Sequence, residues 1–271
     1  MKNLLSITKE FVSDILFPKF CLNCRKEGSY LCQDCFSIID ILKRQYCPFC
    51  YPPKSVADGK TCIYCRKRKR LNGLYCAASY NNFIAKKLIN QFKYEPYIKE
   101  LSKPLSSLII AHFLNLETPT FGIEKTSRAA RGLSSPPHHN PEVWCRGEDN
   151  LKENKDVILI PVPLYKNKLK QRGFNQAEEI AKELSKFLKI PIITDALIKI
   201  KPTPAQVELD KKQRKNNIKG VFSVKNPEAI KQKKILLVDD VFTTGTTMEE
   251  CAKILKEHNV KKIWGVVVAR G

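Results

Sequence analysis

The sequence predicts an α/β protein in which a parallel sheet is flanked by helices and preceded by a Cys-rich zinc-ribbon unit. Short apolar runs alternate with segments whose apolar residues recur at helical spacing, as in βαβ units. Four CxxC pairs lie among the first 65 of 271 residues, which is typical of small metal-stabilised folds. We therefore expect an N-terminal helix and double zinc ribbon at residues 1–70 and one α/β domain at residues 71–271.

The first residues are rich in apolar side chains but do not predict a secretory signal. Glu10 and Asp14 interrupt the run from Leu4 to Phe17, and no small-residue cleavage site follows. The pattern favours a short amphipathic helix that packs on the ribbon. No other run is long enough to cross a membrane, so we expect a cytoplasmic protein whose thiols stay reduced.

Eight of the eleven cysteines form the four CxxC pairs. Two pairs supply four thiolates to one tetrahedral ion, so four pairs predict two structural Zn²⁺ ions. A disulfide framework lacks a secretory signal to support it, and redox chemistry would need only one reactive pair. We favour sequential pairing, the first with the second and the third with the fourth, although the spacing leaves the order open. The expected ligands are Cys21, Cys24, Cys32, Cys35, Cys47, Cys50, Cys62 and Cys65.

Several elements of the α/β domain can be placed from periodicity. Helices are expected at 82–93 and 97–115 and along the apolar positions from Ala177 to Leu188. Strands are expected at 157–160, 220–224, 235–238 and 263–268, and their alternation with helices predicts a parallel sheet.

The stretch at 117–155 breaks this order. It is rich in Pro, Ser, Gly, Arg and Asn and has no period, so we expect a disordered insertion. His138, His139 and Cys145 lie in it, but their spacing fits no standard metal site.

The strongest functional signal is the segment VDDVFTTGTT at 238–247. An apolar strand precedes it, and Met248, Cys251, Ala252 and Leu255 mark one face of a following helix. Free amides at a helix N-terminus suit a phosphate, and the carboxyl end of a parallel strand is where open sheets bind ligands. The pattern predicts a site for a ribose 5'-phosphate. Its candidate residues are Asp239, Asp240, Thr243, Thr244, Gly245, Thr246 and Thr247.

The same residues also fit a simpler structural interpretation. Thr246 can cap the helix, and Glu249, three residues later, can complete a capping box. We expect this box in addition to the site, because a box alone leaves two adjacent carboxylates without hydroxyl donors or a cation.

Two further segments bear on the site. Pro161, Val162 and Pro163 form a rigid turn, in which a cis Val162–Pro163 bond is conceivable, and a basic stretch with Lys168, Lys170 and Arg172 leads to the helix start GFNQ. This arrangement suits a pyrophosphate, although a basic helix cap explains it too. Residues 203–217, with Lys211, Lys212 and Arg214, suit a mobile basic flap or a solvated charge run.

The segment ILLVDDVFTTGTT resembles the phosphoribosyl pyrophosphate (PRPP) motif of type I phosphoribosyltransferases, with Phe242 at a usually aliphatic position, from which we expect only local repacking. Nearly the whole chain outside 117–155 resembles the ComF family of competence protein F and GntX-like proteins. The resemblance rests on LFP before the CxxC knuckles, FKY at 92–94, the PVPL and RGFNQ segments, QRKNN with GVF, and the PRPP motif. It implies a type I phosphoribosyltransferase-like domain behind a double zinc ribbon.

The resemblance also implies roles for individual residues. Asp239 and Asp240 would hold the ribose hydroxyls, directly or through Mg²⁺ and water, and Thr243 to Thr247 would cradle the 5'-phosphate. Val162, Pro163 and Leu164 with Arg172 would line the pyrophosphate side, and Arg214 would lie on the flap. Family members are linked to uptake and use of extracellular DNA in competent bacteria, so natural competence or nucleotide salvage is expected, with enzymatic turnover open.

The net charge of +21 favours a rival hypothesis, a single-stranded-DNA-binding accessory protein that works with the DNA-uptake machinery. The run Arg66, Lys67, Arg68, Lys69 and Arg70 follows the last ribbon cysteine. Four tyrosines could stack on bases, Tyr64, Tyr75, Tyr80 and Tyr94. A regulator that senses PRPP without turning it over is a third possibility.

Overall fold

The computed structural model describes residues 18–116, 156–202, 218 and 220–271. Three predictions lie outside these residues: the N-terminal helix before Pro18, the insertion with His138, His139 and Cys145, and the flap with Lys211, Lys212 and Arg214.

Four parallel strands form the main sheet, in the order β1-β6-β5-β2. Their bounds are β1 Gly73–Ser79, β2 Val157–Pro161, β5 Lys234–Phe242 and β6 Lys262–Arg270. The strands are buried along most of their length because helices cover both faces, which confirms the predicted class. The edge strand β1 was missing from the sequence prediction, and both central strands are longer than predicted.

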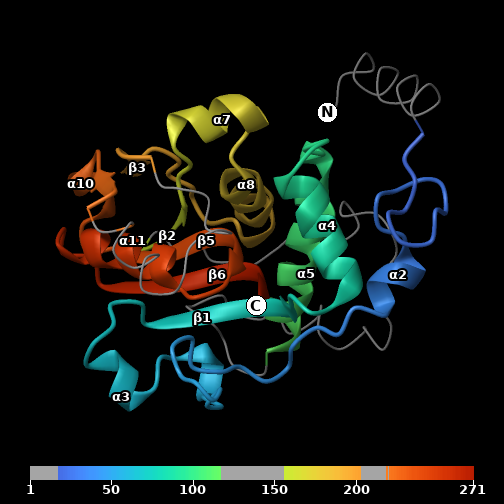
Figure 1. Cartoon of the computed structure of the whole chain (residues 1–271). Coiled ribbons are helices and arrows are strands. Elements are labelled where there is room, and N and C mark those ends of the chain that lie inside the picture. Colours follow the sequence, from blue (N-terminus) through green and yellow to red (C-terminus); the bar gives the residue numbers. More distant parts are fainter. Residues whose placement is uncertain (1–17, 117–155, 203–217, 219) are drawn as a thin grey trace.

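The helices lie on the two faces of this sheet (Figure 1). On one face are α4 Phe83–Lys93, α5 Ser102–Asn115 and α8 Gln176–Leu188, and α11 Thr246–Lys256 is on the other. Helix α4 begins where predicted, because the Asn82 side chain accepts a hydrogen bond from Ala85 N at 3.0 Å. The helix expected from residue 97 begins later, since Tyr97 has a φ of 53° and a short 3-10 turn precedes α5.

The remaining elements are short. They are α2 Gln33–Ser37, η1 Ala57–Gly59, α3 Ile63–Arg66, η2 Lys99–Leu101, α7 Lys166–Arg172 and α10 Pro227–Ile230. One predicted strand has a different role from the one expected. β4 Phe222–Val224 pairs antiparallel with β3 Leu197–Lys199 in a separate two-stranded sheet. Its three residues carry too little periodic signal to distinguish a hairpin-like pair from a strand of the parallel sheet.

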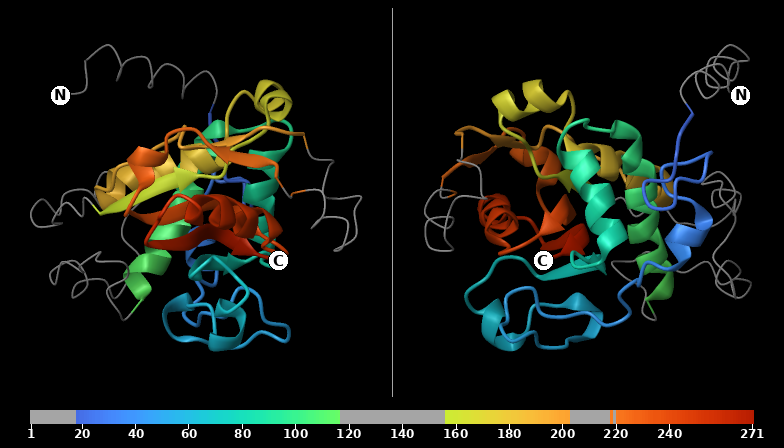
Figure 2. Two further views of the ribbon diagram at one scale, coloured as in Figure 1. Left: turned by 90° about the vertical axis from the view of Figure 1, so that its left-hand side faces the viewer. Right: turned by 45° about the vertical axis from the view of Figure 1, so that its right-hand side comes forward.

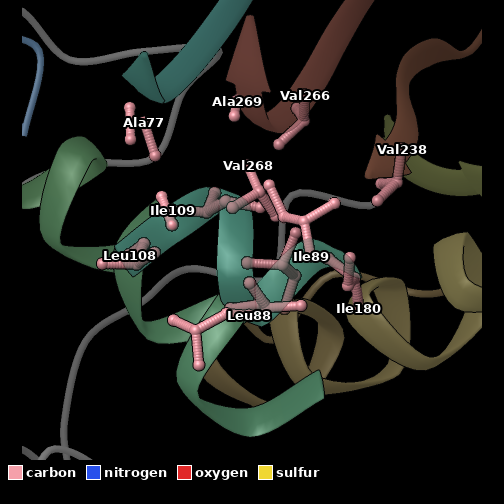
Figure 3. Close-up of a cluster of buried hydrophobic side chains, with 14 of the residues drawn as sticks. Ala77, Leu88, Ile89, Leu108, Ile109, Ile180, Val238, Val266, Val268 and Ala269 are labelled. Carbon is pink, nitrogen blue, oxygen red and sulfur yellow. The ribbon is translucent and has the colours of Figure 1, made fainter. Parts of the chain in front are cut away.

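The side chains of β5 alternate between two cores. Leu236 and Val238 join α4, α5 and α8, whereas Ile235 and Leu237 face α11. Figure 3 shows the first core, in which Leu88 and Ile89 of α4 meet the sheet residues Val266 and Val268. This packing places the carboxyl end of β5 between helices on both sides.

The cysteine-rich units lie in different places (Figures 1 and 2). Ribbon 1, residues 18–39, lies beside α4 and α5, and its Cys21, Leu31 and Ile39 belong to the core of that face. Ribbon 2, residues 45–66, lies beyond the β1 edge, and its Phe49 packs against the core on the α11 face. Within the described part of the chain, no helix has the length and apolar character that crossing a bilayer requires. The domain boundary at residue 70 stays a prediction.

Candidate functional site

The acidic pair lies where β2 leaves the sheet. β2 pairs with β5 only as far as Pro161 opposite Val238, whereas β5 continues to Phe242. Asp239 and Asp240 therefore lie inside the last part of the strand, three and two residues before its end, rather than directly after it as the sequence suggested. A crevice beside the carboxyl ends of parallel strands is the usual ligand site of open α/β sheets.

The two carboxylates have different surroundings. Asp240 is 4% exposed, and its Oδ1 lies 2.9 Å from Lys93 Nζ at the end of α4. Asp239 is partly exposed, and its Oδ1 accepts a hydrogen bond from Asp240 N at 2.9 Å. Burial and the adjacent Asp240 raise the pKa of Asp239 to about 7, against the opposing charge of Lys93. Burial also opposes the charge of Lys93, but the two carboxylates outweigh it and raise the pKa of the lysine.

The turn after β5 has the form expected of a phosphate cradle. Gly245 has a φ of 72°, a left-handed conformation that favours glycine, and α11 begins at Thr246. The hydroxyls of Thr244 and Thr246 lie 2.8 Å apart, and Thr246 N donates to Thr244 Oγ1 at 3.4 Å. Thr243 is exposed at the same turn. Hydroxyl donors and the start of a helix thus meet beside the acidic pair.

The predicted capping box is wrong. Gly245 is the N-cap residue, and Thr246 is already the first residue of the helix. The Glu249 carboxylate instead accepts hydrogen bonds from Arg70 N at 2.9 Å and Leu71 N at 3.2 Å. Glu249 therefore attaches α11 to the segment that follows ribbon 2.

The unusual aromatic residue of the motif lies beneath its glycine. Phe242 is 2% exposed, and a Cβ atom at Gly245 would overlap its ring. The ring also meets Phe49 edge to face, with centroids 6.1 Å apart and planes at 62°. The contacts of Phe242 thus extend to ribbon 2, further than the local repacking expected from sequence.

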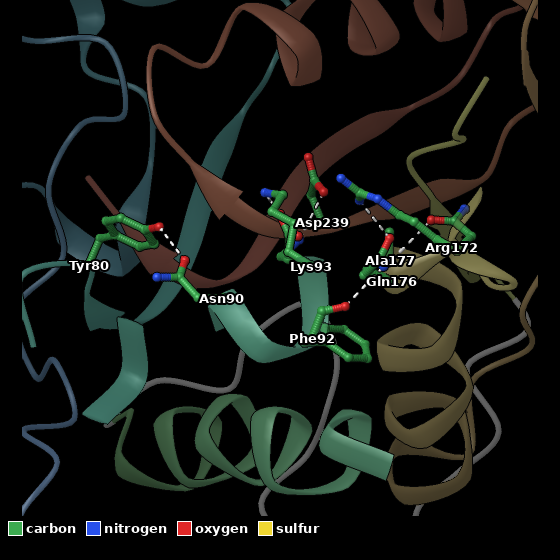
Figure 4. Close-up of polar contacts among 10 residues, drawn as sticks. Tyr80, Asn90, Phe92, Lys93, Arg172, Gln176, Ala177 and Asp239 are labelled. Atoms are coloured by element: carbon green, nitrogen blue, oxygen red, sulfur yellow. Dashed lines mark hydrogen bonds and ion pairs between the residues drawn. The ribbon is translucent and has the colours of Figure 1, made fainter. Parts of the chain in front are cut away.

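The expected pyrophosphate side is held together by side-chain amides (Figure 4). Asn175 Nδ2 donates to Val162 O at 3.1 Å, and Gln176 Nε2 donates to Phe92 O at 3.0 Å. Gln176 Oε1 accepts from Arg172 Nη1 at 2.9 Å, which orients the guanidinium. Among the described residues the cis bonds are Tyr51–Pro52 and Glu95–Pro96, so the Val162–Pro163 bond is trans and the cis alternative was wrong.

Cations from three elements act on one another at this side. Burial, followed by the charges of Arg172 and Lys93, lowers the pKa of Lys168. Burial, followed by the charge of Lys168, lowers the pKa of Lys199 to about 8, and Asp239 opposes that shift. Such a concentration of positive charge suits a ligand with several phosphate oxygens. Sequence reasoning gave no role to Lys93 or Lys199, although the FKY segment contains the first.

The eight ribbon cysteines form two groups of four, with the sulfurs of each group within 4.8 Å of one another. The grouping confirms the sequential pairing. Sulfurs of a tetrahedral zinc site lie about 3.8 Å apart, given Zn–S bonds of about 2.3 Å. The Sγ atoms of Cys24 and Cys32 are 3.4 Å apart, and those of Cys50 and Cys65 are 3.7 Å apart. Both groups therefore fit one structural zinc ion each.

In each group, backbone hydrogen bonds lower the pKa of one thiol. The backbone N–H of Cys65 lowers the pKa of Cys62 to about 6. At Cys21, burial acts to raise the pKa. The backbone N–H groups of Cys32, Cys24 and Asn23 outweigh it and lower the pKa of Cys21 to about 6. Other thiols of the same groups shift in the opposite direction: burial and the neighbouring thiols raise the pKa of Cys32 and of Cys65 to about 12.

The basic run after ribbon 2 lies near α11. Lys69 Nζ lies 4.5 Å from the centroid of the Phe49 ring. Around the run is an open cavity of about 440 Å³, lined by Arg68, Arg70, Glu249, Lys253, Lys256 and Glu257. Tyr75 is 2% exposed and stacks on Trp264, so the expectation that it stacks on bases is wrong. Tyr64, at 73% exposed, and Tyr94, at 49%, are accessible, as is Tyr51, at 95%, which sequence reasoning did not select.

Residues 148–271 match the family model described as the phosphoribosyl transferase domain. Three of the four parallel strands, β2, β5 and β6, belong to this part of the chain, as do the acidic pair and the turn after β5. This part of the chain is therefore similar to the phosphoribosyltransferase class, as the resemblance to the type I fold predicted.

Its relatives include "Competence protein F" of Haemophilus influenzae, 38% identical over 114 residues, which cover 41% of this chain and 50% of the relative. "DNA utilization protein YhgH" of Escherichia coli K12 is 33% identical over 105 residues, which cover 39% of this chain and 45% of that protein. "Competence protein ComFC" of Bacillus subtilis is 32% identical over 104 residues, which cover 38% of this chain and 40% of that protein. The matches thus span half or less of these relatives. They confirm the resemblance to the ComF family.

Proposed function

We propose that the chain binds PRPP together with Mg²⁺ and serves in DNA uptake or nucleotide salvage. One observation carries the proposal. An acidic pair on β5, beyond the last residue that pairs with β2, is followed by a glycine turn with threonine hydroxyls at the start of α11. This arrangement offers partners for the hydroxyls and the phosphate of one ribose 5'-phosphate group.

The proposed roles follow the surroundings of each residue. Asp239, which is partly exposed, holds ribose hydroxyls, and Asp240 supports it while paired with Lys93. Carboxylate oxygens are also the donors that Mg²⁺ prefers. The turn from Thr243 to Thr247 receives the 5'-phosphate. Val162, Pro163 and Leu164 with Arg172 face the pyrophosphate, and Arg214, proposed for the flap, lies outside the described residues.

Turnover would displace pyrophosphate from C1 of the ribose by a nitrogen nucleophile. The C1–O bond breaks, the C1–N bond forms, and the bond electrons leave with pyrophosphate. Mg²⁺ would neutralise part of the phosphate charge. Arg172 and Lys168 stabilise the negative charge that develops on the leaving group, and the Asp239 and Asp240 carboxylates favour the positive charge that develops at C1.

Isothermal titration calorimetry with PRPP and Mg²⁺ tests the proposal. We expect the wild type to give a measurable heat of binding. Combining Asp239→Asn with Asp240→Asn should weaken the affinity by more than about 100-fold, because two charge-assisted contacts are removed. Equal affinities would remove the acidic pair from the site. Release of pyrophosphate, measured separately with nitrogen bases, distinguishes an enzyme from a PRPP-sensing regulator.

Binding of single-stranded DNA is a second candidate, favoured by the surface of ribbon 2. Tyr51 and Tyr64 of this ribbon are 95% and 73% exposed. The basic residues at its end and directly after it are also exposed, namely Arg66, Lys67, Arg68 and Arg70. Cations that track phosphates and aromatic rings that stack on bases are the usual elements of such surfaces. Lys253 and Lys256 extend the positive charge along α11.

A further inference from the structure

Three kinds of contact join ribbon 2 to the proposed phosphate turn. The first is aromatic. Phe49, between the ligands Cys47 and Cys50, packs edge to face on Phe242 at 6.1 Å, and the Phe242 ring fills the space where a side chain at Gly245 would lie. A displacement of Phe49 would therefore remove support from the ring beneath the glycine of the turn.

The second contact is a guanidinium bridge. Arg270 Nη1 and Nη2 donate to Cys47 O and Pro48 O, each at 3.3 Å. The same guanidinium lies 5.9 Å from the Phe242 ring centroid. Arg270 also pairs with Phe242 across β6 and β5. The first metal knuckle of ribbon 2 is thus held against the end of the strand that carries the acidic pair.

The third contact involves Glu249 in the first turns of α11. Its carboxylate accepts the amides of Arg70 and Leu71, the residues that lead from ribbon 2 into β1. Burial raises the pKa of Glu249, and these two amides oppose the shift. Ribbon 2 therefore supports the turn on its N-terminal side through Phe242. The segment that follows ribbon 2 supports the turn on its C-terminal side through Glu249.

We propose that ribbon 2 positions the phosphate turn, with Phe49 as a positioning residue that acts through Phe242. Metal at Cys47, Cys50, Cys62 and Cys65 keeps Phe49 in place, so affinity for a ribose 5'-phosphate group depends on that metal and much less on the metal of ribbon 1. This inference rests on the proposed PRPP function and assigns one part of it to ribbon 2.

The experiment compares two phenylalanines, each partly buried and each next to a ligand cysteine. Phe49→Ala in ribbon 2 is matched by Phe36→Ala in ribbon 1, whose side chain packs against the α4 and α5 core. The probes are ribose 5-phosphate and, separately, pyrophosphate with Mg²⁺, both titrated calorimetrically. We expect Phe49→Ala to weaken ribose 5-phosphate about 5- to 10-fold, the range of an aromatic pair, and to leave pyrophosphate within about twofold. Phe36→Ala should change neither.

The metal arm uses Cys24→Ser and Cys50→Ser, at the second ligand of each ribbon. Each variant should lose one zinc by elemental analysis, and only Cys50→Ser should weaken ribose 5-phosphate. If either variant loses both probes and its far-UV dichroism, it has unfolded, and the comparison of Phe49→Ala with Phe36→Ala then decides.

Unchanged affinity of Phe49→Ala, or equal weakening in both phenylalanine variants, would overturn the inference. A parallel loss of pyrophosphate binding by folded Phe49→Ala would do so as well, because it indicates a general structural effect. A wild type that binds neither probe would instead overturn the proposed function.

Discussion

The two ribbons offer the same four ligands but differ in what surrounds them. Ribbon 1 contributes Leu31 and Ile39, at 7% and 3% exposed, to the core beneath α4 and α5. Ribbon 2 exposes Tyr51 and Tyr64 and attaches to the site through Phe49 and backbone groups. The difference shows that the same four-cysteine arrangement can extend a core in one place and present an exposed surface in another.

Removal of one metal ligand should give the largest effects. We expect two zinc ions per wild-type chain, and one in each of Cys32→Ser and Cys62→Ser, by elemental analysis of protein purified without chelator. Both variants should lose more than about 4 kcal/mol of unfolding free energy in denaturant titrations. The loss should be greater for Cys32→Ser because ribbon 1 is part of the core. A wild-type value near one would contradict the assignment of two sites.

Truncation of the apolar contacts sharpens the comparison. Ile39→Ala in ribbon 1 should cost about 2–4 kcal/mol of unfolding free energy, because the side chain is buried. Phe49→Ala should cost only about 1 kcal/mol, since its ring is partly exposed. Urea unfolding of both variants measures the difference. The contrast between the ribbons fails if Phe49→Ala is as destabilising as Ile39→Ala.

The stability of the chain should depend on pH through Asp239 on β5, the strand that lies between the two cores. The pKa of Asp239 is raised to about 7 from an ordinary value of 3.8, so the folded chain holds this proton more tightly than the unfolded chain. The resulting loss of stability is absent below the unfolded pKa, grows as pH rises and is complete above about 7. Asp239→Asn should therefore raise the melting temperature at pH 8 by about 2–4 °C, corresponding to about 1 kcal/mol, and by less at pH 5. An equal shift at both pH values would contradict the assignment.

The smallest effects should concern the charges on the ribbon surfaces. If ribbon 2 binds single-stranded DNA, the affinity should fall with salt by about 0.7 log units per log unit of salt for each phosphate neutralised. Replacing Arg66, Lys67, Arg68, Lys69 and Arg70 by Gln should flatten this slope. The control is Arg25→Gln with Lys26→Gln on exposed positions of ribbon 1. Fluorescence anisotropy at several salt concentrations would show an unchanged slope if the run is only a solvated linker.

The sequence predicted features whose signals are local. The motif at 238–247 lies on one strand, turn and helix, and the sulfurs of each ribbon come from neighbouring knuckles. Lys93 was missed because its partner Asp240 is 147 residues away. The partners of Glu249 are similarly distant, so only its local capping pattern was visible. β1 has Ala77 and Ala78 in its middle and lacks the branched residues that predict a strand.

The bridge from Arg270 to Cys47 also concerns the order in which the molecule is made. These residues are 223 positions apart, whereas the four ligands of ribbon 2 lie within one short segment from Cys47 to Cys65. A ribosome releases the N-terminal part first, and contacts between distant residues form late in folding. We therefore expect ribbon 2 to capture its metal while the nascent chain is still growing. Ribbon 2 can bond to the neighbouring β1 early, through the bridge between Lys60 and Gly73, but its contacts with Arg270 form only after β6 has left the exit tunnel.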